Sequence, residues 1–358
     1  MITIKDVAKL ANVSEGTVDR VLHNRGGVSL KTEKLIKEIL KKHNYTVNPI
    51  ARALSIKNKF SLYTLMPNHD KTNLFWKSPL LGVLKASQEV RAYGVEVTNY
   101  TFDQFKPSSY LNEFKTLIKS KPHAVLIAPT FIKETKEIVN ELEKLDIPYA
   151  FLNIDLEGFK NILFVGQNSY AAGYVAGKLM HLSCPDQSSI LVIQTRLNIN
   201  NYYAFSKRIE GFNDYFTKND IKVNIINLNF DNLKDLKEVG KNLNSLLKKE
   251  KSIKGVFVPS SRISIIVNCI DEPLMNNLNL IGFDNTEPNI KCLQENKVSF
   301  LISQKPFDQG YESIHLMTDF LIKNKTPIKK IYSPIDILTK ENVIYNERDK
   351  SMFESDSI

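Results

Sequence analysis

The sequence predicts a small, all-helical N-terminal domain followed by a much larger α/β region made of two lobes, each with a doubly wound parallel sheet. At 358 residues the chain is too long for one ordinary hydrophobic core. Apolar residues repeat at helical spacing near the N-terminus. From Ser61 onward, short apolar runs alternate with amphipathic segments, as in βαβ units. We therefore expect a helical headpiece over 1–47, a linker over 48–59 and a two-lobed domain over 60–358.

Three helices are predicted in the headpiece from their capping residues. Thr3 is a candidate N-cap with Asp6 three residues later, an acidic variant of the capping box. Ser14 offers an N-cap for a second short helix, and Ser29 offers one for a longer third helix. On the third helix, Leu35, Ile36, Ile39 and Leu40 are expected to point inward, and Lys34, Lys37, Lys41 and Lys42 outward. Two short helices joined by a tight turn, with a third against them, would share one small core.

The positive charge of the chain is concentrated at its N-terminus. Residues 1–59 carry 12 Lys and Arg against 5 Asp and Glu, a net charge of +7, whereas the remaining residues carry a net +2. Such a segment is expected of a nucleic-acid-binding module, because neutralising phosphates releases counterions. Charge alone does not distinguish this interpretation from an ordinary solvated lysine-rich face.

A short helix is predicted after the headpiece. Asn48 and Pro49 read as an N-cap followed by proline at the first helical position, and the helix would run through Leu54. A helix this short does not hold by itself in water, so we expect it to order only against DNA and a second copy of itself. The alternative is a flexible linker.

The N-terminal residues resemble the headpiece and hinge of the LacI/GalR repressor family. The resemblance rests on TIKDVAKLANVSEGTVDRVLHNRGGVS at 3–29 and NYTVNPIARAL at 44–54. It implies that the second helix, which begins after Ser14, enters the major groove of operator DNA. It also implies that Leu54 wedges between base pairs in the minor groove. The positions that it places on DNA are Ile4, Ser14, Glu15, Gly16, Thr17, Arg20, His23, Ser29, Asn48, Ala51 and Leu54.

Residues on the second helix and at its N-cap determine which base pairs the helix could recognise. Arg20 can present two donors to guanine, the commonest specific contact in the major groove. Ser14 suits a phosphate oxygen, or it only caps its helix. The family commonly has neutral polar residues where this chain has Glu15, Gly16 and Asp19, so its operator sequence does not carry over. Glu15 could accept a hydrogen bond from cytosine N4.

Ten strands in two sets of five are predicted for the larger region. The first set is Leu62–Met66, Val95–Tyr100, Ala124–Ala128, Tyr149–Asn153 and Ile162–Val165, with helices near 79–92, 109–120, 133–145 and 169–183. The second set is Ile190–Ile193, Val223–Leu228, Gly255–Val258, Leu280–Phe283 and Phe300–Ile302. Doubly wound sheets bind ligands beyond the carboxyl ends of their strands, so we expect a binding cleft between the lobes.

This region resembles, more loosely, the type I periplasmic sugar-binding proteins and the effector domains of the same repressors. The landmarks, in order, are Phe75-Trp76, Ile147-Pro148, Arg208–Phe212, Gly282–Asp284 and Ser303–Pro306. The residues that the resemblance places around the cleft are Phe75, Trp76, Asn153, Arg208, Ser260, Asp284 and Gln304.

The residue types suit a sugar. Trp76 can stack on the apolar face of a sugar ring, and Arg208, Asp284 and two amides can bind hydroxyls. The alternatives are a core position for Trp76, a surface ion pair for Arg208 and a helix cap for Asp284. Sugar-binding relatives often have an Asp-Arg pair where this chain has Asn153-Ile154-Asp155. Either Asp155 contributes to binding, or the ligand is not a simple aldopentose or aldohexose.

Catalytic, metal and membrane functions find no support in the motifs. The sequence has no GxSxG, GxxxxGK[ST] or HExxH motif, and no GxGxxG after a strand. Its six histidines lack metal-ligand spacing, and its three cysteines are scattered. We find no signal peptide and no apolar stretch of membrane-spanning length. We therefore expect a cytoplasmic protein without enzymatic activity, metal or other cofactor.

The sequence as a whole favours a transcriptional repressor that binds a pseudo-palindromic operator as a homodimer and responds to a small effector, expected to be a sugar. A sugar receptor of a transport system shares the two-lobed fold and is the main alternative. A regulator driven by a partner protein instead of a metabolite is the second alternative.

Overall fold

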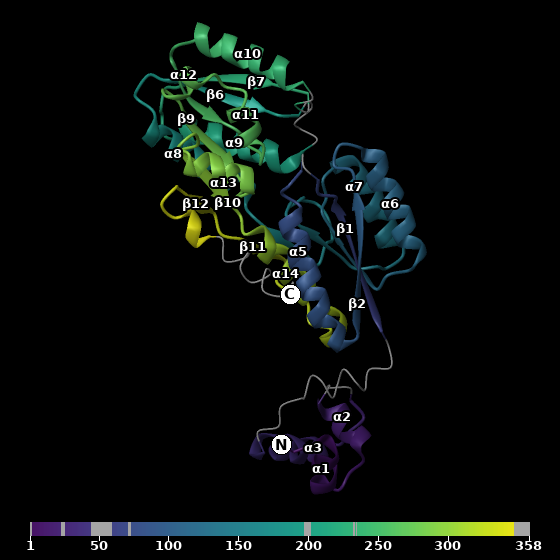
Figure 1. The fold of residues 1–358 in the computed structure, drawn as a ribbon. Coiled ribbons are helices and arrows are strands. Elements are labelled where there is room, and N and C mark those ends of the chain that lie inside the picture. The colour runs from purple at the N-terminus through teal and green to yellow at the C-terminus, as the bar shows by residue number, and fades with distance from the viewer. Residues whose placement is uncertain are drawn as a thin grey trace, which may run out of the picture. The chain divides into compact units, whose positions relative to one another are not determined.

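The computed structural model describes residues 2–22, 26–43, 59–70, 73–196, 202–231, 233 and 235–346. Contacts divide the chain into two compact units, Met1–Lys57 and Asn58–Ile358 (Figure 1). The short helix predicted from Asn48 to Leu54 lies outside the described residues. The boundaries predicted at 47 and 59 stay a proposal.

The smaller unit, which we call the headpiece, contains the three predicted helices. They are α1 (Ile4–Ala11), α2 (Glu15–Leu22) and α3 (Leu30–Lys42). The capping box is present, because the Asp6 backbone N–H donates to Thr3 Oγ1 and the Asp6 carboxylate accepts from the Thr3 N–H at 3.0 Å. Ser14 accepts from the N–H of Thr17, and Ser29 accepts from that of Thr32. Local capping therefore defines where each helix starts.

The headpiece core is built from one face of each helix. Its buried residues are Val7, Ala8, Ala11, Val18, Val21 and Ile36. Ile39 and Leu40 pack against this core as predicted, but the prediction for Leu35 is wrong, since its side chain is 43% exposed. Leu35 precedes Ile36 by one residue, which turns its side chain about 100° away from the buried face. The four predicted outward lysines of α3 are exposed.

The first lobe of the larger unit is a six-stranded parallel sheet in the order β11-β5-β4-β3-β1-β2. Its strands are β1 (Phe60–Pro67), β2 (Val95–Phe102), β3 (Ala124–Ile127), β4 (Tyr149–Leu152), β5 (Leu163–Gly166) and β11 (Lys330–Tyr332). Helices α5 (Lys77–Val90) and α14 (Pro306–Lys323) cover one face, and α6 (Pro107–Lys119) and α7 (Ile132–Lys144) cover the other (Figure 1). A 3-10 turn follows α5 at Arg91–Tyr93. Apolar cores fill both sides of the sheet.

The second lobe repeats this architecture in the order β12-β10-β9-β8-β6-β7, with only β12 antiparallel to its neighbour. Its strands are β6 (Ser189–Gln194), β7 (Asn224–Asn229), β8 (Ile253–Phe257), β9 (Asn279–Phe283), β10 (Phe300–Ser303) and β12 (Asp336–Leu338). One core lies under α8 (Ser169–Ser183) and α9 (Tyr203–Lys218). The other lies under α10 (Leu236–Lys249), α11 (Ile263–Val267), α12 (Glu272–Met275) and α13 (Glu287–Gln294), and Val343–Tyr345 forms a final 3-10 turn.

All ten predicted strands are confirmed to within a few residues, and two strands were missed. The missed strands, β11 and β12, have three residues each and no run of alternating apolar residues. Each adds an edge to a different lobe, so the chain crosses between the lobes after β5, after β10 and between β11 and β12. These crossings join the lobes at one end of their sheets.

Each lobe has one very close helix pair that glycine makes possible. A Cβ on Gly82 of α5 would overlap the carbonyl oxygen of Phe307, and one on Gly310 of α14 would overlap that of Pro79. In the second lobe, Gly173 of α8 approaches the backbone of α9 in the same way, at the carbonyl of Arg208. This face of α8 therefore packs directly on the backbone of α9, and the contact sets the position of α9 beside the cleft.

Candidate functional site

A cleft in the larger unit collects residues from both lobes. Its empty volume, including its open mouth, is about 650 Å³, which is within the usual range for small-molecule sites. Most of its lining follows the carboxyl ends of strands, as expected for doubly wound sheets. The predicted ligand residues that line it are Phe75, Trp76, Asn153, Arg208, Ser260, Asp284 and Gln304. The structure therefore brings together seven of the eight predicted positions, whose roles in binding stay a prediction.

A buried hydrogen-bond network joins the two lobes across the cleft. Asn153 follows β4 and Asp284 follows β9, at matching places in the two lobes, and both have a left-handed φ of 69°. The Asn153 amide donates to Gln304 Oε1 at 2.9 Å, and Gln304 Nε2 donates to Asp284 Oδ1 at 2.7 Å. Asn153 also donates to Gln309 Oε1 at 2.9 Å. Gln304 thus fixes one polar residue from each lobe.

Arg208 places a buried positive charge near Asp284, the acidic member of this network. Arg208 is 3% exposed, and its Nη1 donates to the carbonyl oxygen of Pro259 at 3.1 Å. The guanidinium stacks 3.9 Å from the centre of the Phe283 ring, and its Nε has no hydrogen-bond partner among the described residues. Burial raises the pKa of Asp284, and the positive charge of Arg208 opposes that rise. The unpartnered Nε leaves a buried donor for a ligand.

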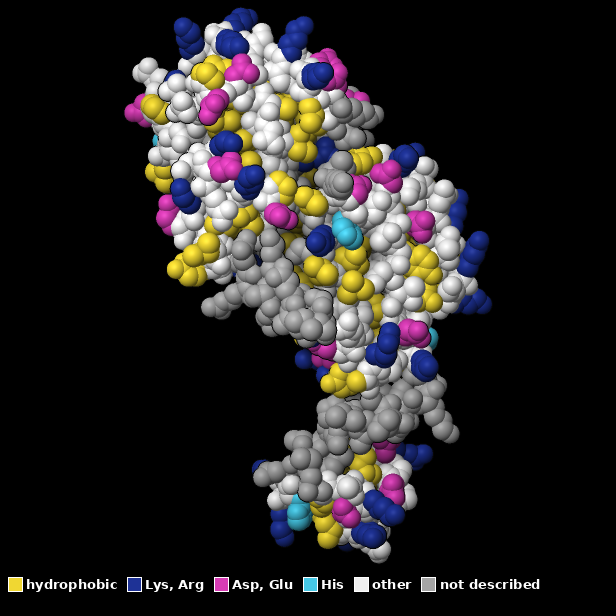
Figure 2. Space-filling view, in the orientation of Figure 1, with side chains coloured by type: hydrophobic (Ala, Val, Ile, Leu, Met, Phe, Trp, Pro, Cys, Tyr) yellow, Lys and Arg dark blue, Asp and Glu magenta, His cyan; other side chains and the backbone are white. Residues whose placement is uncertain are grey.

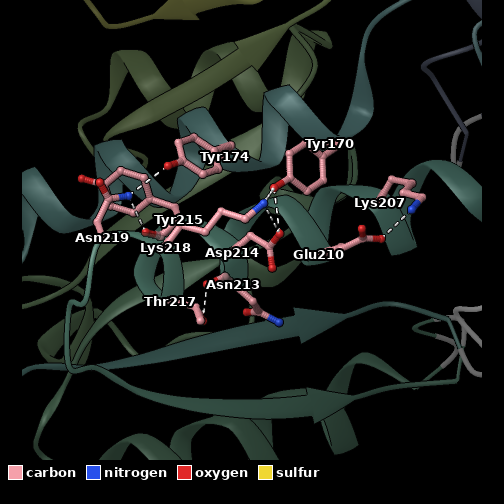
Figure 3. Close-up of polar contacts among 10 residues, drawn as sticks. All are labelled: Tyr170, Tyr174, Lys207, Glu210, Asn213, Asp214, Tyr215, Thr217, Lys218 and Asn219. Atoms are coloured by element: carbon pink, nitrogen blue, oxygen red, sulfur yellow. Dashed lines mark hydrogen bonds and ion pairs between the residues drawn. The ribbon is translucent and has the colours of Figure 1, made fainter.

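The helix that carries Arg208 is held from its outer side. Figure 3 shows Tyr170 and Tyr174 of α8 facing Asp214 and Lys218 of α9 and Asn219, which follows α9 directly. The Tyr170 hydroxyl donates to Asp214 and accepts from Lys218, both at 2.7 Å, and Asn219 donates to the Tyr174 hydroxyl at 2.9 Å. Hydrogen bonds from Lys218 and Tyr170 lower the pKa of Asp214, and hydrogen bonds to Tyr170 and Asp214 raise the pKa of Lys218. Together with the Gly173 contact, they hold α9 so that Arg208 reaches the cleft.

Two further arginines in the cleft were missed by the sequence reading. Arg196 is 7% exposed and donates to Gln104 Oε1 at 2.6 Å, and its guanidinium lies 4.4 Å from the Tyr202 ring centre. Arg262 donates to the carbonyl oxygen of Thr195 at 3.4 Å. Both follow strands of the second lobe, β6 and β8 respectively. The rule that ligands bind at the carboxyl ends of strands was the signal that could have found them.

Trp76 lines the cleft and also belongs to the core of the first lobe. It is 5% exposed and packs edge-to-face against Phe75, with ring centres 5.2 Å apart. The sequence left a stacking role and a core role as alternatives, and the position of Trp76 is compatible with both. Its stacking on a sugar stays a prediction.

Asp155, the eighth predicted residue, does not line the cleft. Its Oδ2 accepts a hydrogen bond from Lys330 Nζ at 2.6 Å, and its side chain is 17% exposed. Lys330 is the first residue of β11, the short edge strand that the sequence reading missed. The ion pair ties that strand to the loop after β4, so we do not carry Asp155 forward as a ligand contact.

The predicted DNA-contacting residues lie mostly on the surface of the headpiece. Those that are exposed are Ser14, Glu15, Gly16, Arg20 and Ser29. Thr17 is half-buried, and Ile4 packs on the headpiece core. His23, Asn48, Ala51 and Leu54 lie outside the described residues. Helix α2 thus turns Val18 and Val21 inward and leaves the opposite face accessible, with basic side chains elsewhere on the surface (Figure 2).

Within the described part of the chain, no group of three or more His, Cys, Asp or Glu side chains could hold a metal ion. The cysteines Cys184, Cys269 and Cys292 are free. None of the described helices is both long enough and apolar enough to cross a membrane.

A helix-turn-helix headpiece joined to a two-lobed domain with a polar cleft defines a ligand-responsive DNA-binding regulator. Residues 3–48 match the family model for bacterial regulatory proteins of the lacI family, and residues 63–325 match that for a periplasmic binding protein domain. The chain belongs to the LacI family of DNA-binding transcriptional regulators, and its larger unit is a periplasmic binding protein domain.

Curated relatives and solved structures agree with this assignment. The chain is 24% identical to the ribose operon repressor of Halalkalibacterium halodurans, covering 95% of this chain and 97% of the relative. It is 24% identical to catabolite control protein A of Priestia megaterium, covering 90% and 93%. A Bacteroides fragilis protein described as a LacI transcriptional regulator has a TM-score of 0.74 and 28% identity, over 80% of this chain and 99% of that structure. GanP, a glucose-galactose binding protein from Geobacillus stearothermophilus, shares the fold at a TM-score of 0.67 and 17% identity, over 80% and 99%.

Proposed function

We propose that the protein is a cytoplasmic transcriptional repressor whose affinity for its operator is set by a sugar or sugar derivative bound in the cleft. The Asn153–Gln304–Asp284 network is the observation that carries the ligand half of this proposal. It presents buried amide and carboxylate groups from both lobes to one space, which suits a small molecule with many hydroxyls. The names of the relatives, a ribose operon repressor among them, support the same class of ligand.

The headpiece is proposed to bind DNA through α2. Its exposed face carries Arg20, which can donate two hydrogen bonds to a guanine. Ser14 caps the helix and leaves its N-terminus available to a phosphate oxygen. Glu15 is also exposed, at the first position of α2, where it would repel phosphates or accept from cytosine N4. We propose that Glu15 contributes to specificity through the cytosine contact.

Ligand binding is proposed to act by changing the arrangement of the two lobes relative to each other. A ligand that contacts Asn153 in one lobe and Asp284 in the other stabilises the lobe arrangement in which both contacts form. In a homodimer on a pseudo-palindromic operator, that arrangement sets the relation between the two headpieces. The coupling is then the difference in ligand affinity between the DNA-bound and free states. The proposal requires no catalytic step.

The test measures ligand binding and DNA binding on the full chain. Thermal unfolding with a panel of sugars, sugar acids and sugar phosphates identifies a ligand, because a molecule that binds only the folded state raises its apparent stability. Fluorescence anisotropy with DNA selected from a random pool then measures operator affinity at several salt concentrations. We expect the affinity to fall steeply with salt.

A matched variant separates the two activities. Asp284→Asn removes a buried negative charge of the cleft, and we expect it to lose ligand binding while keeping operator affinity. A chain that binds a sugar but no DNA at low salt is a transport-type receptor, and the proposal fails. A chain that binds DNA but no small molecule of the panel contradicts the effector half of the proposal.

A further inference from the structure

We propose that Gln309 of α14 orients the amide of Asn153 so that Asn153 offers a molecule in the cleft only a hydrogen-bond acceptor. Gln309 does not belong to the described lining of the cleft, so it acts as a positioning residue. The cleft then selects a molecule whose hydroxyl group donates a hydrogen bond at this point. Since that molecule is the effector of the proposed function, the inference rests on that function.

The backbone around Gln309 is held firmly near the start of α14. Gln309 is fully buried, its N–H donates to the carbonyl oxygen of Lys305 at 3.2 Å, and its own carbonyl oxygen accepts from Ser313 Oγ at 2.6 Å. The next residue, Gly310, lies against the carbonyl of Pro79 in α5, where a Cβ would overlap. The Gln309 side chain therefore starts from a fixed point in the first lobe.

A backbone carbonyl determines which way the Gln309 amide faces. Gln309 Nε2 donates to the carbonyl oxygen of Gln304 at 2.7 Å, and a carbonyl oxygen can only accept. The Oε1 end of Gln309 therefore faces Asn153, where it accepts from Asn153 Nδ2 at 2.9 Å. The reverse orientation of Gln309 would bring two acceptors, its Oε1 and the Gln304 carbonyl oxygen, into contact.

A second chain of hydrogen bonds gives the Asn153 amide the same orientation. Gln304 Nε2 donates to Asp284 Oδ1 at 2.7 Å, and a carboxylate can only accept. Burial raises the pKa of Asp284, while Arg208 and this hydrogen bond favour its charged form. Gln304 Oε1 therefore faces Asn153 and accepts from Asn153 Nδ2 at 2.9 Å. The two hydrogens on the Asn153 amide nitrogen are thus both used by glutamine oxygens.

The atom that Asn153 leaves for the cleft is its amide oxygen. Asn153 Oδ1 accepts no hydrogen bond from the described residues, and it is not among the fully buried atoms without a partner, so a molecule in the cleft can reach it. The same is true of Asp284 Oδ2. Each lobe therefore presents one acceptor oxygen, and Arg208 Nε adds a buried donor.

This pattern of donors and acceptors discriminates between chemical groups. A hydroxyl can donate to Asn153 Oδ1, whereas an ether, carbonyl or carboxylate oxygen would face it with a second acceptor. Rotating the Asn153 amide would break its hydrogen bonds to both Gln304 and Gln309, so Asn153 cannot adapt to such a group. A molecule without a donor here loses affinity, because the acceptor is left without the water that it gave up.

The first test needs no ligand. Asn153→Asp replaces the amide nitrogen with an oxygen of similar size and places a carboxylate against the Oε1 atoms of Gln304 and Gln309. We expect the full chain, followed by the fluorescence of its single tryptophan, Trp76, to unfold at least about 5 °C below wild type. Asn140→Asp, on the exposed face of α7, is the matched control and should unfold within about 1 °C of wild type. An unchanged unfolding temperature for Asn153→Asp overturns the inference, because Asn153 then already presents an oxygen to the glutamines.

The second test varies the ligand by isothermal titration calorimetry with the full chain. The probes are D-ribose, D-glucose, D-galactose and D-fructose, each with its deoxy and deoxyfluoro analogue at every hydroxyl position. Fluorine cannot donate a hydrogen bond. At the hydroxyl that Asn153 binds, we expect both analogues to bind about 10- to 100-fold more weakly than the parent sugar. If every deoxyfluoro analogue binds as tightly as its parent, no hydroxyl is needed as a donor and the inference is overturned.

A variant of Gln309 then separates positioning from general structural support. Gln309→Met keeps the length of the side chain and removes its hydrogen bonds, which frees the Asn153 amide to rotate. We expect the parent sugar to bind about tenfold more weakly, and the deoxy analogue that lacks the hydroxyl at Asn153 to change by less than about threefold. Gln294→Met, exposed at the end of α13, is the matched control and should change neither affinity.

The outcomes distinguish this inference from the proposed function. If Gln309→Met weakens the parent sugar and its deoxy analogue equally, Gln309 has only a structural role, and the inference is overturned while the proposed function stands. If Gln309→Met leaves both affinities unchanged, the inference is overturned in the same way. Binding of none of the four sugars overturns the inference together with the effector half of the proposed function.

Discussion

The headpiece and the cleft use arginine in opposite ways. Arg20 is exposed on α2, where water and salt screen its charge, whereas Arg196 and Arg208 are buried beside aromatic rings. An exposed charge attracts any polyanion and gains specificity only through hydrogen bonds to a base edge. A buried charge rejects ligands that cannot compensate it. The difference teaches that the surroundings of an arginine, and not its charge alone, determine whether it attracts DNA or selects a small ligand.

The largest expected effect separates the two regions physically. We predict that removing residues 1–58 abolishes DNA binding and leaves the affinity for the cleft ligand within about twofold. The reason is that the headpiece and the larger unit have separate cores. Anisotropy with operator DNA and calorimetry with the ligand measure the two properties. A truncated chain that fails to fold would contradict the proposed boundary.

The next effect contrasts two helical glycines. Gly173→Ala places a methyl group against the backbone of α9, and we expect the larger unit to lose roughly 3 kcal/mol of unfolding free energy. Gly16→Ala is the matched change in the headpiece, where the new methyl group meets only Ser14 Oγ at 3.8 Å. It should stabilise the headpiece by up to about 1 kcal/mol. Denaturant unfolding followed by circular dichroism measures both variants. If both substitutions change the free energy of unfolding in the same direction, the prediction is wrong.

Arg20→Ala tests whether the exposed arginine reads sequence. We expect it to weaken operator binding by about 1–3 kcal/mol and to relax the preference at one base pair, with little change in binding to random DNA. Competition anisotropy against a set of single-base operator variants measures this. Lys34→Ala, on the exposed face of α3, is the control and should weaken all sequences alike. If Arg20→Ala weakens binding to all DNA sequences equally, Arg20 contacts phosphates and not a base.

The smallest effect concerns the capping box and its dependence on pH. Hydrogen bonds from Thr3 lower the pKa of Asp6 below its ordinary value of 3.8. The stabilisation is therefore fully present above that value, and it is lost as the pH falls through the lowered pKa. Asp6→Asn should unfold the headpiece at a lower temperature at pH 7, and the difference from wild type should vanish near about pH 2. A difference that persists unchanged in acid would show that the carboxylate charge is not the cause.

How much the sequence predicts depends on the distance over which each feature is determined. The caps at Thr3, Ser14 and Ser29 depend on residues three positions away, so local spacing was sufficient to predict them. The ten longer strands have apolar runs that identify them. The three-residue strand β11 has none, because its place is set by pairing with β5 and by the ion pair between Lys330 and Asp155.

The cleft shows the same limit in its residues. Seven of its members were predicted from a resemblance that preserves their order along the chain. Arg196 and Arg262 were missed because nothing in their neighbouring sequence distinguishes them from surface arginines. They become a pair only when β6 and β8 lie side by side in the sheet and Phe105 from the other lobe packs against both. Pairing across so many residues requires the fold.

The most direct test of the account is whether the cleft and the headpiece are coupled. Ligand affinity is measured by calorimetry with and without saturating operator DNA, and operator affinity is measured by anisotropy with and without saturating ligand. Thermodynamic linkage requires the change in ligand affinity caused by DNA to equal the change in operator affinity caused by the ligand. We predict a factor of about 5 to 150 for both changes. Ratios of one in both measurements, with ligand and DNA each shown to bind, would contradict the account.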